Sequence, residues 1–273
     1  MQYINSSLKA KKLFLLDIDG TVSLDTEWIE GALEFLNLIR EQGGKYIFIT
    51  NNSTKGIKDY VEKYTKMGLK VDETNFLTAS YVTGYFLKQH YQHELLYILG
   101  TKSFLQELKS FGLSVTEELS EDTINKISAA IVGFDSELNY GKVTDICRLL
   151  QTRQVNYYAT NKDLACPTGF GFIPDCGAIC SMIGYAVKRE PEFLGKPNPM
   201  MVTMALELYG YSLEDTLVIG DRLYTDIACG LNAGADTLLV FTGEAKEKDL
   251  KTTEYPPDYY CNTIKELYQL FLS

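Results

Sequence analysis

KLFLLDIDGT, residues 12–21, is the stretch from which the fold can be argued, because an apolar run stops there at two aspartates and a glycine. A continuous apolar segment bounded by glycine is typical of a strand that is buried on both faces of a parallel sheet. We therefore expect a buried strand over Lys12–Asp17, with Asp17 and Asp19 at its carboxyl end.

Helix-like and strand-like segments alternate after this strand. Residues 28–42 carry apolar side chains at helical spacing and stop at a pair of glycines, and YIFI at residues 46–49 is again strand-like. We expect a second helix that Ser53 caps and that ends near Gly68. A strand, a helix and another strand in succession predict a βαβ unit.

The same alternation returns near the C-terminus. The expected elements are a helix at 198–209, a strand at 216–219, a helix at 224–232 and a strand at 237–241. We therefore predict an α/β protein with a doubly wound, Rossmann-like parallel sheet, which binds its ligand at the carboxyl ends of the strands. Asp17, Thr50 and Asp221 stand at such ends.

The segment between these halves is long enough to form a domain of its own. It contains strand-like runs at 95–99, 129–132 and 155–159, with helical segments between them. Because the same kind of fold is expected on both sides of it, we predict an insertion into a discontinuous core. The predicted catalytic core is residues 1–78 and 189–273, and the predicted inserted α/β cap domain, which would close as a lid, is residues 79–188.

The bulk composition limits the range of partners. The 273 residues carry a formal net charge of −10, which disfavours nucleic acid and anionic membranes because both attract basic surfaces. No apolar run approaches the length of a membrane span. The N-terminus lacks the pattern of a secretion signal and the six cysteines form no zinc pattern, so we expect a cytoplasmic protein with reduced cysteines.

Asp17 and Asp19 are candidates for paired acid chemistry. The turn that Gly20 allows at the end of the strand can direct both carboxylates into one cleft. One of them would attack phosphorus to form an aspartyl phosphate, and the other would protonate the leaving oxygen and then activate water. An isolated Asp-Gly-Thr also occurs as a simple strand-end turn, so this assignment depends on the other motifs.

Two further segments offer groups that bind phosphate. TNNS, which begins at Thr50, lies between a predicted strand and a predicted helix, where hydroxyl, amide and backbone N–H groups favour an anion. Thr50, Asn51 and Asn52 are the candidates. Lys196, in the segment GKPNP, would neutralise both the nucleophile and the phosphate as a compact charge. Each segment by itself also has an interpretation without a ligand. The first would be a helix N-cap, and the second would be a loop with a solvated lysine.

The segment GDRLYTD follows another predicted strand and supplies Asp221 and Asp226. Mg²⁺ prefers oxygen ligands and keeps several waters, so Asp17, Asp221 and the backbone carbonyl of Asp19 would satisfy it. Asp226 fits better as a support that positions Lys196 or a metal-bound water. By itself, the pair of acids also fits a helix N-cap with an acid in the first turn.

Taken together and in this order, the four segments closely resemble those of the haloacid dehalogenase superfamily: DIDGT, then TN, then KP, then GD followed by Asp226. The resemblance spans nearly the whole chain. It implies a magnesium-dependent phosphatase in which Asp17 is the nucleophile and a metal ligand and Asp19 is the general acid and base. It also implies that Lys196 neutralises charge and that Asp221 binds the metal.

The insertion between Thr50 and Lys196 resembles the class-II cap arrangement, and ATNKD at residues 159–163 with GAI at residues 177–179 looks like the NagD-like, or p-nitrophenyl phosphatase-like, branch. The resemblance implies that a cap loop over residues 161–177 selects the leaving group. Substrates in that branch include sugar phosphates, nucleotide monophosphates, phosphoglycolate and pyridoxal phosphate, so a small phosphorylated metabolite is the expected partner. The segment IPDCG within the loop departs from a glycine-richer form. A homodimer is left open as the assembly.

Three other interpretations compete with this one. A dehalogenase of similar fold would need no magnesium and would lack the acid at the position of Asp19. A phosphomutase usually has its cap soon after the nucleophile motif, where this chain has room for only one helix and a strand. A phospholigand-binding or regulatory protein that has lost turnover belongs to a different functional class, and measured turnover separates it from an enzyme.

Overall fold

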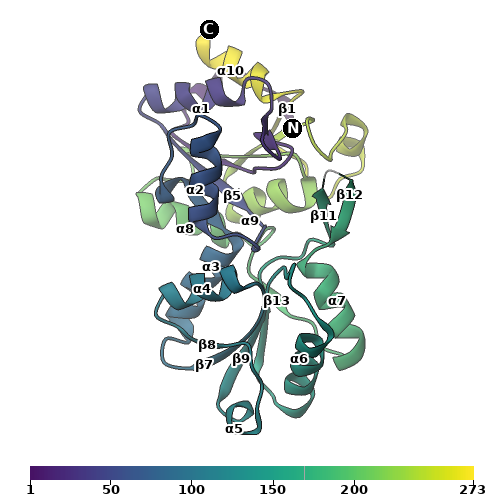
Figure 1. The fold of residues 1–273 in the computed structure, drawn as a ribbon. Coiled ribbons are helices and arrows are strands. Elements are labelled where there is room, and N and C mark those ends of the chain that lie inside the picture. The colour runs from purple at the N-terminus through teal and green to yellow at the C-terminus, as the bar shows by residue number, and fades with distance from the viewer. Residues whose placement is uncertain (169) are drawn as a thin grey trace. The chain divides into compact units, whose positions relative to one another are not determined.

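The computed structural model describes residues 1–168 and 170–273 and divides into two compact units (Figure 1). Unit 1 comprises residues 1–50, 58–77 and 196–273, and unit 2 comprises residues 51–57 and 78–195. Gly169, which falls within the predicted cap loop, lies outside the described residues. Each unit therefore joins segments that are distant in the sequence.

Unit 1 is built on a parallel β-sheet. Its strands, in spatial order, are β1 (Gln2–Tyr3), β16 (Tyr259–Cys261), β15 (Asp236–Val240), β14 (Thr216–Gly220), β2 (Leu13–Leu16), β5 (Lys45–Thr50) and β6 (Phe76–Thr78). Each pairing from β1 across to β5 is parallel. All side chains of β2 and β14 are buried, as expected for strands that are covered on both faces.

The strand order reverses at β2, which lies between β5, its successor in this sheet, and β14, which comes much later in the chain. The backbone N–H of Asp17 still bonds to the carbonyl of Ile219 at 2.9 Å, so the ladder with β14 extends to the aspartate. The point where strand order reverses is the usual ligand site of such a sheet. The predicted doubly wound α/β core is confirmed.

The helices of this part of the chain and its small hairpin flank the sheet. The α-helices are α1 (Ala32–Glu41), α2 (Ile57–Lys66), α8 (Met200–Tyr209), α9 (Ala228–Ala233) and α10 (Ile264–Leu272). The short helical turns are η1 (Ser6–Ala10), η2 (Glu73–Asn75), η3 (Leu223–Ile227) and η4 (Glu247–Lys251), and the hairpin is β3 (Ser23–Leu24) with β4 (Glu27–Trp28).

The first helix begins later than the apolar spacing indicated. Trp28 belongs to the hairpin instead, and the helix starts after Gly31, whose φ of +83° is left-handed. A Cβ on Gly31 would lie 2.6 Å from the Cα of Lys265 in α10, so the close approach of α10 requires glycine there. Aromatic packing of Phe35 against Phe271, with ring centroids 5.4 Å apart, then joins the two helices.

One expected helix cap is wrong, and one expected helix is divided into two parts. Ser53 does not cap α2, which begins at Ile57, because its hydroxyl accepts the N–H of Phe134 at 2.9 Å instead. The helix expected at 224–232 is divided into the π-helical turn η3 and the short α9. Asp226 Oδ2 accepts the backbone N–H of Arg222 at 3.0 Å within this wider turn. Single π turns of this kind often occur at functional sites.

Unit 2 contains its own parallel sheet. The strands, in spatial order, are β13 (Glu192–Phe193), β10 (Asn156–Ala159), β9 (Ile127–Val132), β7 (Leu95–Leu99) and β8 (Ser114–Thr116). Its helices are α3 (Ala79–His90), α4 (Lys102–Ser110), α5 (Glu121–Ile124), α6 (Tyr140–Thr152) and α7 (Cys176–Val187), and an antiparallel hairpin pairs β11 (Ala165–Thr168) with β12 (Gly171–Pro174).

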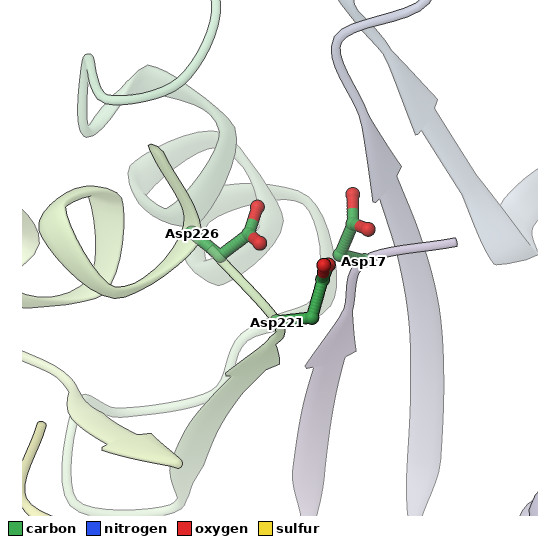
Figure 2. A group of neighbouring side chains, drawn as sticks. All are labelled: Asp17, Asp221 and Asp226. Carbon is green, nitrogen blue, oxygen red and sulfur yellow. The ribbon is translucent and has the colours of Figure 1, made fainter. Parts of the chain in front are cut away.

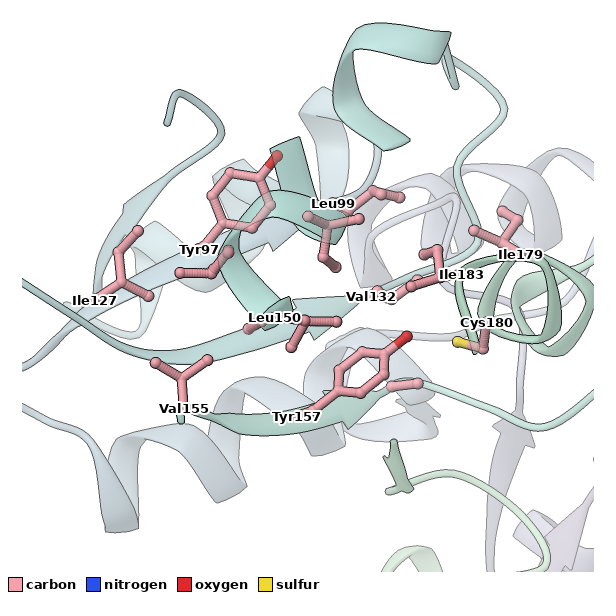
Figure 3. Packing of buried hydrophobic residues seen from close by; sticks show 14 of the residues in the cluster. Tyr97, Leu99, Ile127, Val132, Leu150, Val155, Tyr157, Ile179, Cys180 and Ile183 are labelled. Carbon is pink, nitrogen blue, oxygen red and sulfur yellow. The ribbon is translucent and has the colours of Figure 1, made fainter. Parts of the chain in front are cut away.

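Alternating residues of β7 show why this sheet is covered on both faces. Tyr97 and Leu99 pack into one apolar cluster with residues of α6 and α7, as Figure 3 shows, and Ile98 packs into another with residues of α3 and α4. Because successive side chains of a strand point to opposite faces, both faces are apolar only when helices cover both.

The cysteines in the described residues are all free thiols, although the sulfurs of Cys176 and Cys180 lie 4.0 Å apart in α7. No helix among the described residues is long and apolar enough to cross a membrane.

Candidate active site

Acidic side chains converge at the carboxyl ends of β2 and β14. Asp17 follows β2, Asp221 follows β14 and Asp226 lies in η3, and Figure 2 shows their carboxylates turned toward one another. Oxygens of all three lie within 4.8 Å of one another. The structure therefore brings together acids that stand far apart in the sequence.

The ammonium group of Lys196 lies against this cluster. Its Nζ donates to Asp17 Oδ1 at 2.6 Å, to Asp226 Oδ1 at 2.7 Å and to the backbone carbonyl of Ile49 at 3.0 Å. The side chains of Lys196 and Asp226 are only 2% and 1% exposed. Lys196 thus contacts both Asp17 and Asp226, and the supporting role predicted for Asp226 stays a prediction.

Burial governs the protonation of these groups. Burial raises the pKa of Asp17 well above its ordinary value and Asp226 raises it further, while Lys196 opposes both effects. Burial would lower the pKa of Lys196, but the carboxylates of Asp17 and Asp226 outweigh it and raise that pKa. Burial, followed by the charge of Asp226, raises the pKa of Asp221 to about 6. The acids are thus held together at an electrostatic cost that a further positive charge would offset.

A hard divalent cation fits this donor set, because Mg²⁺ prefers carboxylate oxygens and takes one or two of them. Both oxygens of Asp226 are already engaged, one by Lys196 and the other by the N–H of Arg222. Hydrogen bonds also reach both oxygens of Asp221, from the N–H of Glu244 and the hydroxyl of Thr21, so the choice of Asp17 and Asp221 as the carboxylate ligands stays a prediction. The backbone carbonyl of Asp19 is the third ligand that the sequence predicted, and it stays a prediction.

The backbone after β15 fixes the orientation of Asp221. The N–H of Glu244 donates to Asp221 Oδ2 at 2.7 Å, and the N–H of Ala245 donates to its backbone carbonyl at 3.1 Å. A Cβ on Gly243 would overlap the Asp221 carboxylate. Nothing in the sequence pattern had pointed to Gly243 or Glu244 as parts of this site.

We expect Gly243→Ala to weaken magnesium binding at least about tenfold without unfolding the chain, because the added methyl displaces the Asp221 carboxylate. The magnesium concentration for half-maximal activity measures the effect. Gly56→Ala is the matched control, since its new Cβ would meet nothing nearer than 3.8 Å. An unchanged magnesium requirement would show that the position of Asp221 does not determine metal affinity.

Asp19 lies just beyond Asp17, with Ile18 between them. Burial raises the pKa of Asp19, and Lys63 and Arg222 lower it less strongly. A raised pKa favours the protonated carboxyl, which is the form that a general acid needs.

Thr50 ends β5 and is buried in unit 1, where its hydroxyl is a hydrogen-bond partner of Tyr60. Burial, followed by the charge of Asp19, raises the pKa of Tyr60 well above its ordinary value, so this phenol stays neutral. Tyr60 belongs to none of the sequence motifs, so its proximity to the acids could not be inferred from them.

Asn51 and Asn52 belong to unit 2. Asn52 Oδ1 accepts hydrogen bonds from the backbone N–H of Thr54 at 2.9 Å and from its hydroxyl at 2.7 Å, which closes a local turn. Asn51 Nδ2 donates to Asp163 Oδ2 at 2.9 Å. Their binding of phosphate stays a prediction.

Comparison with known proteins identifies the family. A family model for haloacid dehalogenase-like hydrolases matches residues 14–114, and a HAD-hydrolase-like model matches residues 193–267. The 5′-nucleotidase YutF of Bacillus subtilis is 30% identical over 95% of this chain and 98% of its own. The chain belongs to the haloacid dehalogenase-like hydrolases.

Other relatives of this hydrolase carry phosphatase names. An acid sugar phosphatase of Staphylococcus epidermidis is 29% identical over 92% of this chain and 95% of its own. The structure of a 4-nitrophenylphosphatase from Thermotoga maritima matches with a TM-score of 0.90 and 34% identity, over 97% of this chain and 99% of that one. NagD from Escherichia coli K-12 matches with a TM-score of 0.84 and 28% identity, over 94% and 98%.

These similarities confirm several predictions for the hydrolase. The resemblance to the NagD-like, p-nitrophenyl phosphatase-like branch is confirmed, and so is the assignment as an enzyme of the phosphatase type. Nothing in the relatives' names indicates a nucleic acid or a membrane as partner.

Proposed function

We propose that this hydrolase is a magnesium-dependent phosphomonoesterase of small phosphorylated metabolites, with Asp17 as its nucleophile. The observation that carries the proposal is the contact of the Lys196 ammonium with Asp17 at 2.6 Å beside the Asp221 carboxylate. A nucleophile that is itself anionic needs such positive charge before it can approach a phosphate dianion. At about 4 Å and an effective dielectric near 20, each pair of unit charges repels by about 4 kcal/mol.

In the proposed mechanism, a carboxylate oxygen of Asp17 attacks phosphorus and forms an aspartyl phosphate. Asp19 gives its proton to the leaving oxygen and then removes a proton from the water that hydrolyses the intermediate. Lys196 stabilises the charge on Asp17 and on the phosphoryl oxygens. Asp17, the carbonyl of Asp19 and Asp221 would hold magnesium, which when bound would supply further positive charge at the phosphoryl group.

Thr50, Asn51, Asn52 and Lys196 are the proposed phosphate-binding residues. The proposed catalytic core is residues 1–78 and 189–273, and residues 79–188 are the proposed cap that selects the leaving group. Sugar phosphates and nucleotide monophosphates are the substrates to test first, because relatives are named as an acid sugar phosphatase and a 5′-nucleotidase.

Chelation of magnesium is expected to reduce turnover of p-nitrophenyl phosphate and of a panel of phosphorylated metabolites to background, and added Mg²⁺ should restore it.

The magnesium concentration needed for half-maximal activity should also increase as the pH falls through about 6. Asp221, whose pKa lies near that value, then becomes protonated and binds the metal less well. Turnover that survives chelation contradicts the metal dependence. Binding of the metabolites without any turnover would instead identify a phospholigand-binding protein.

A further inference from the structure

The segment Ala159–Asp163, whose similarity to the NagD-like branch is clear in the sequence, has no part in the chemistry described above. In unit 2 it starts at the last residue of β10, and its polar side chains other than the exposed Lys162 are buried: Asn161 is fully buried and Asp163 is only 7% exposed. Buried polar groups of this kind are costly unless hydrogen bonds satisfy them. Their partners therefore indicate what the segment does.

The Asp163 carboxylate binds two asparagine amides. Its Oδ2 accepts from Asn51 Nδ2 at 2.9 Å and from Asn161 Nδ2 at 3.2 Å. A carboxylate accepts hydrogen bonds but does not donate them, so the NH₂ end of Asn51 must face Asp163. The side chain of Asn51 is thereby fixed in one of its two amide orientations.

The other end of the Asn51 amide is restricted as well. A Cβ on Gly195 would lie 2.7 Å from Asn51 Oδ1 and would overlap the carbonyl oxygen of Thr160. The N–H of Gly195 donates to that same carbonyl at 2.7 Å. Asn51 therefore lies between a carboxylate and a closely approaching glycine backbone, in a space that a larger residue at 195 would fill.

A chain of hydrogen bonds supports this arrangement from the side of Ser53. The N–H of Phe134 donates to Ser53 Oγ at 2.9 Å, Ser53 Oγ lies 3.0 Å from Thr160 Oγ1, and Thr160 Oγ1 lies 2.9 Å from Asn161 Oδ1. The Ser53 hydroxyl accepts the N–H of Phe134, so its own hydrogen can be donated to Thr160 Oγ1, which in turn donates to Asn161 Oδ1. Such buried networks hold their members in fixed positions.

Asp175 completes the acidic end of the network. Asn161 Nδ2 donates to Asp175 Oδ1 at 3.0 Å, and this oxygen also accepts the N–H of Cys176 at the start of α7. The Asn161 amide is thus hydrogen-bonded to Thr160, Asp163 and Asp175, and it fixes the position of the Asp163 carboxylate. Asp163 Oδ2 is the atom through which this set contacts the Asn51 amide.

We infer that Asp163 is a positioning residue for phosphate binding, which it serves by fixing the Asn51 side chain and the backbone that continues from Thr50. The inference rests on the proposed function, in which Asn51 binds the phosphate of the substrate. Because the amide NH₂ of Asn51 faces Asp163, the orientation of this amide, and with it the geometry of the proposed phosphate contact, depends on the Asp163 carboxylate. In this role Asp163 acts through Asn51 and not by contact with the substrate.

The test compares Asp163→Leu, Asn51→Ala and the double variant, with p-nitrophenyl phosphate as substrate and inorganic phosphate as competitive inhibitor. We expect Asp163→Leu to raise the KM for p-nitrophenyl phosphate and the inhibition constant of phosphate at least about tenfold, with a smaller change in kcat, because the partner that orients a ligand typically contributes 10–100-fold. If Asp163 acts through Asn51, the double variant should bind phosphate no more weakly than Asn51→Ala alone.

Asp135→Asn is the matched control, since Asp135 is also a buried acid of unit 2 but bonds Lys142 and the N–H of Glu137 instead. It should lower the melting temperature and leave the inhibition constant of phosphate unchanged. Should Asp163→Leu fail to fold, Asp163→Asn, which keeps one acceptor oxygen, should give a smaller change in the same direction.

The outcomes distinguish failure of the positioning role from failure of the proposed function. If Asn51→Ala weakens phosphate binding but Asp163→Leu and Asp163→Asn do not, the positioning role is overturned and the proposed function stands. If Asn51→Ala has no effect while the wild type hydrolyses the substrate, the phosphate-binding role of Asn51 in the proposed function is wrong and the role of Asp163 is overturned with it. Effects of Asp163→Leu and Asn51→Ala that add fully in the double variant also overturn the inference.

Discussion

Replacement of Asp17 with Asn is expected to lower kcat for p-nitrophenyl phosphate about 10⁴-fold or more while the chain stays folded. The amide has nearly the shape of the carboxylate but cannot attack phosphorus, and loss of a nucleophile typically removes a catalytic factor of this size. The melting temperature is expected not to fall. The charge of Asp17 is disfavoured by burial and by Asp226, and Lys196 keeps its ion pair with Asp226 in the variant.

The change should also abolish the covalent intermediate. Acid-quenched wild-type protein is expected to gain the mass of a phosphoryl group during turnover, and Asp17→Asn is not. Asp122→Asn, at the exposed start of α5, is the control for the same chemical change and should keep wild-type rates. Wild-type turnover by Asp17→Asn would place the nucleophile elsewhere.

The site acids could be predicted from the sequence because each one is close in the chain to a strand with a strong apolar signal. Asp17 directly follows the buried β2 and Asp221 directly follows the buried β14, and both strands were expected to within one or two residues. In a parallel sheet, the carboxyl ends of neighbouring strands lie at one edge, so local pattern alone brings the two acids together. The contact of Lys196 with Asp226 corresponds to one of the two supporting roles that were predicted for Asp226.

Other features depend on contacts that no local pattern encodes. The start of α1 is determined by how closely α10 approaches Gly31, and the orientation of Asp221 by the backbone of Gly243 and Glu244. Each contact joins residues that are distant in the chain. The sequence shows only a glycine and an acid, both of which are common in turns.

Ser53 shows how a correct local preference can be overridden. Serine before a helix is favoured as an N-cap because its hydroxyl accepts a backbone N–H of the first turn. Here the hydroxyl accepts the N–H of Phe134 and contacts Thr160, so a tertiary network has replaced the local cap. The same network holds Asn51. The conformation of the asparagine-rich segment is therefore determined by contacts within unit 2 and not by capping of α2.

Replacement of Lys196 with Met is expected to give the largest loss of stability of any single change in this site, about 3–5 kcal/mol in the free energy of unfolding at neutral pH. Removing one partner from a buried ion pair leaves the other charges uncompensated, and that penalty is typically of this size. Here the buried carboxylates of Asp17 and Asp226 both lose their counter-charge. Urea unfolding measures the change, and turnover should be lost with it.

The pH dependence and a second variant test this cause. Burial and mutual repulsion already raise the pKa of Asp17, so protonation removes a charge that is unfavourable in the folded state, and the penalty of Lys196→Met should shrink as the pH falls. Adding Asp226→Asn should recover part of the stability but none of the activity. Lys12→Met, which breaks an ion pair with Asp215 from a lysine that is 65% exposed, should leave the free energy of unfolding nearly unchanged. A loss for Lys196→Met that is equally small would mean that its buried acids are already protonated at neutral pH, which is incompatible with an anionic nucleophile at Asp17.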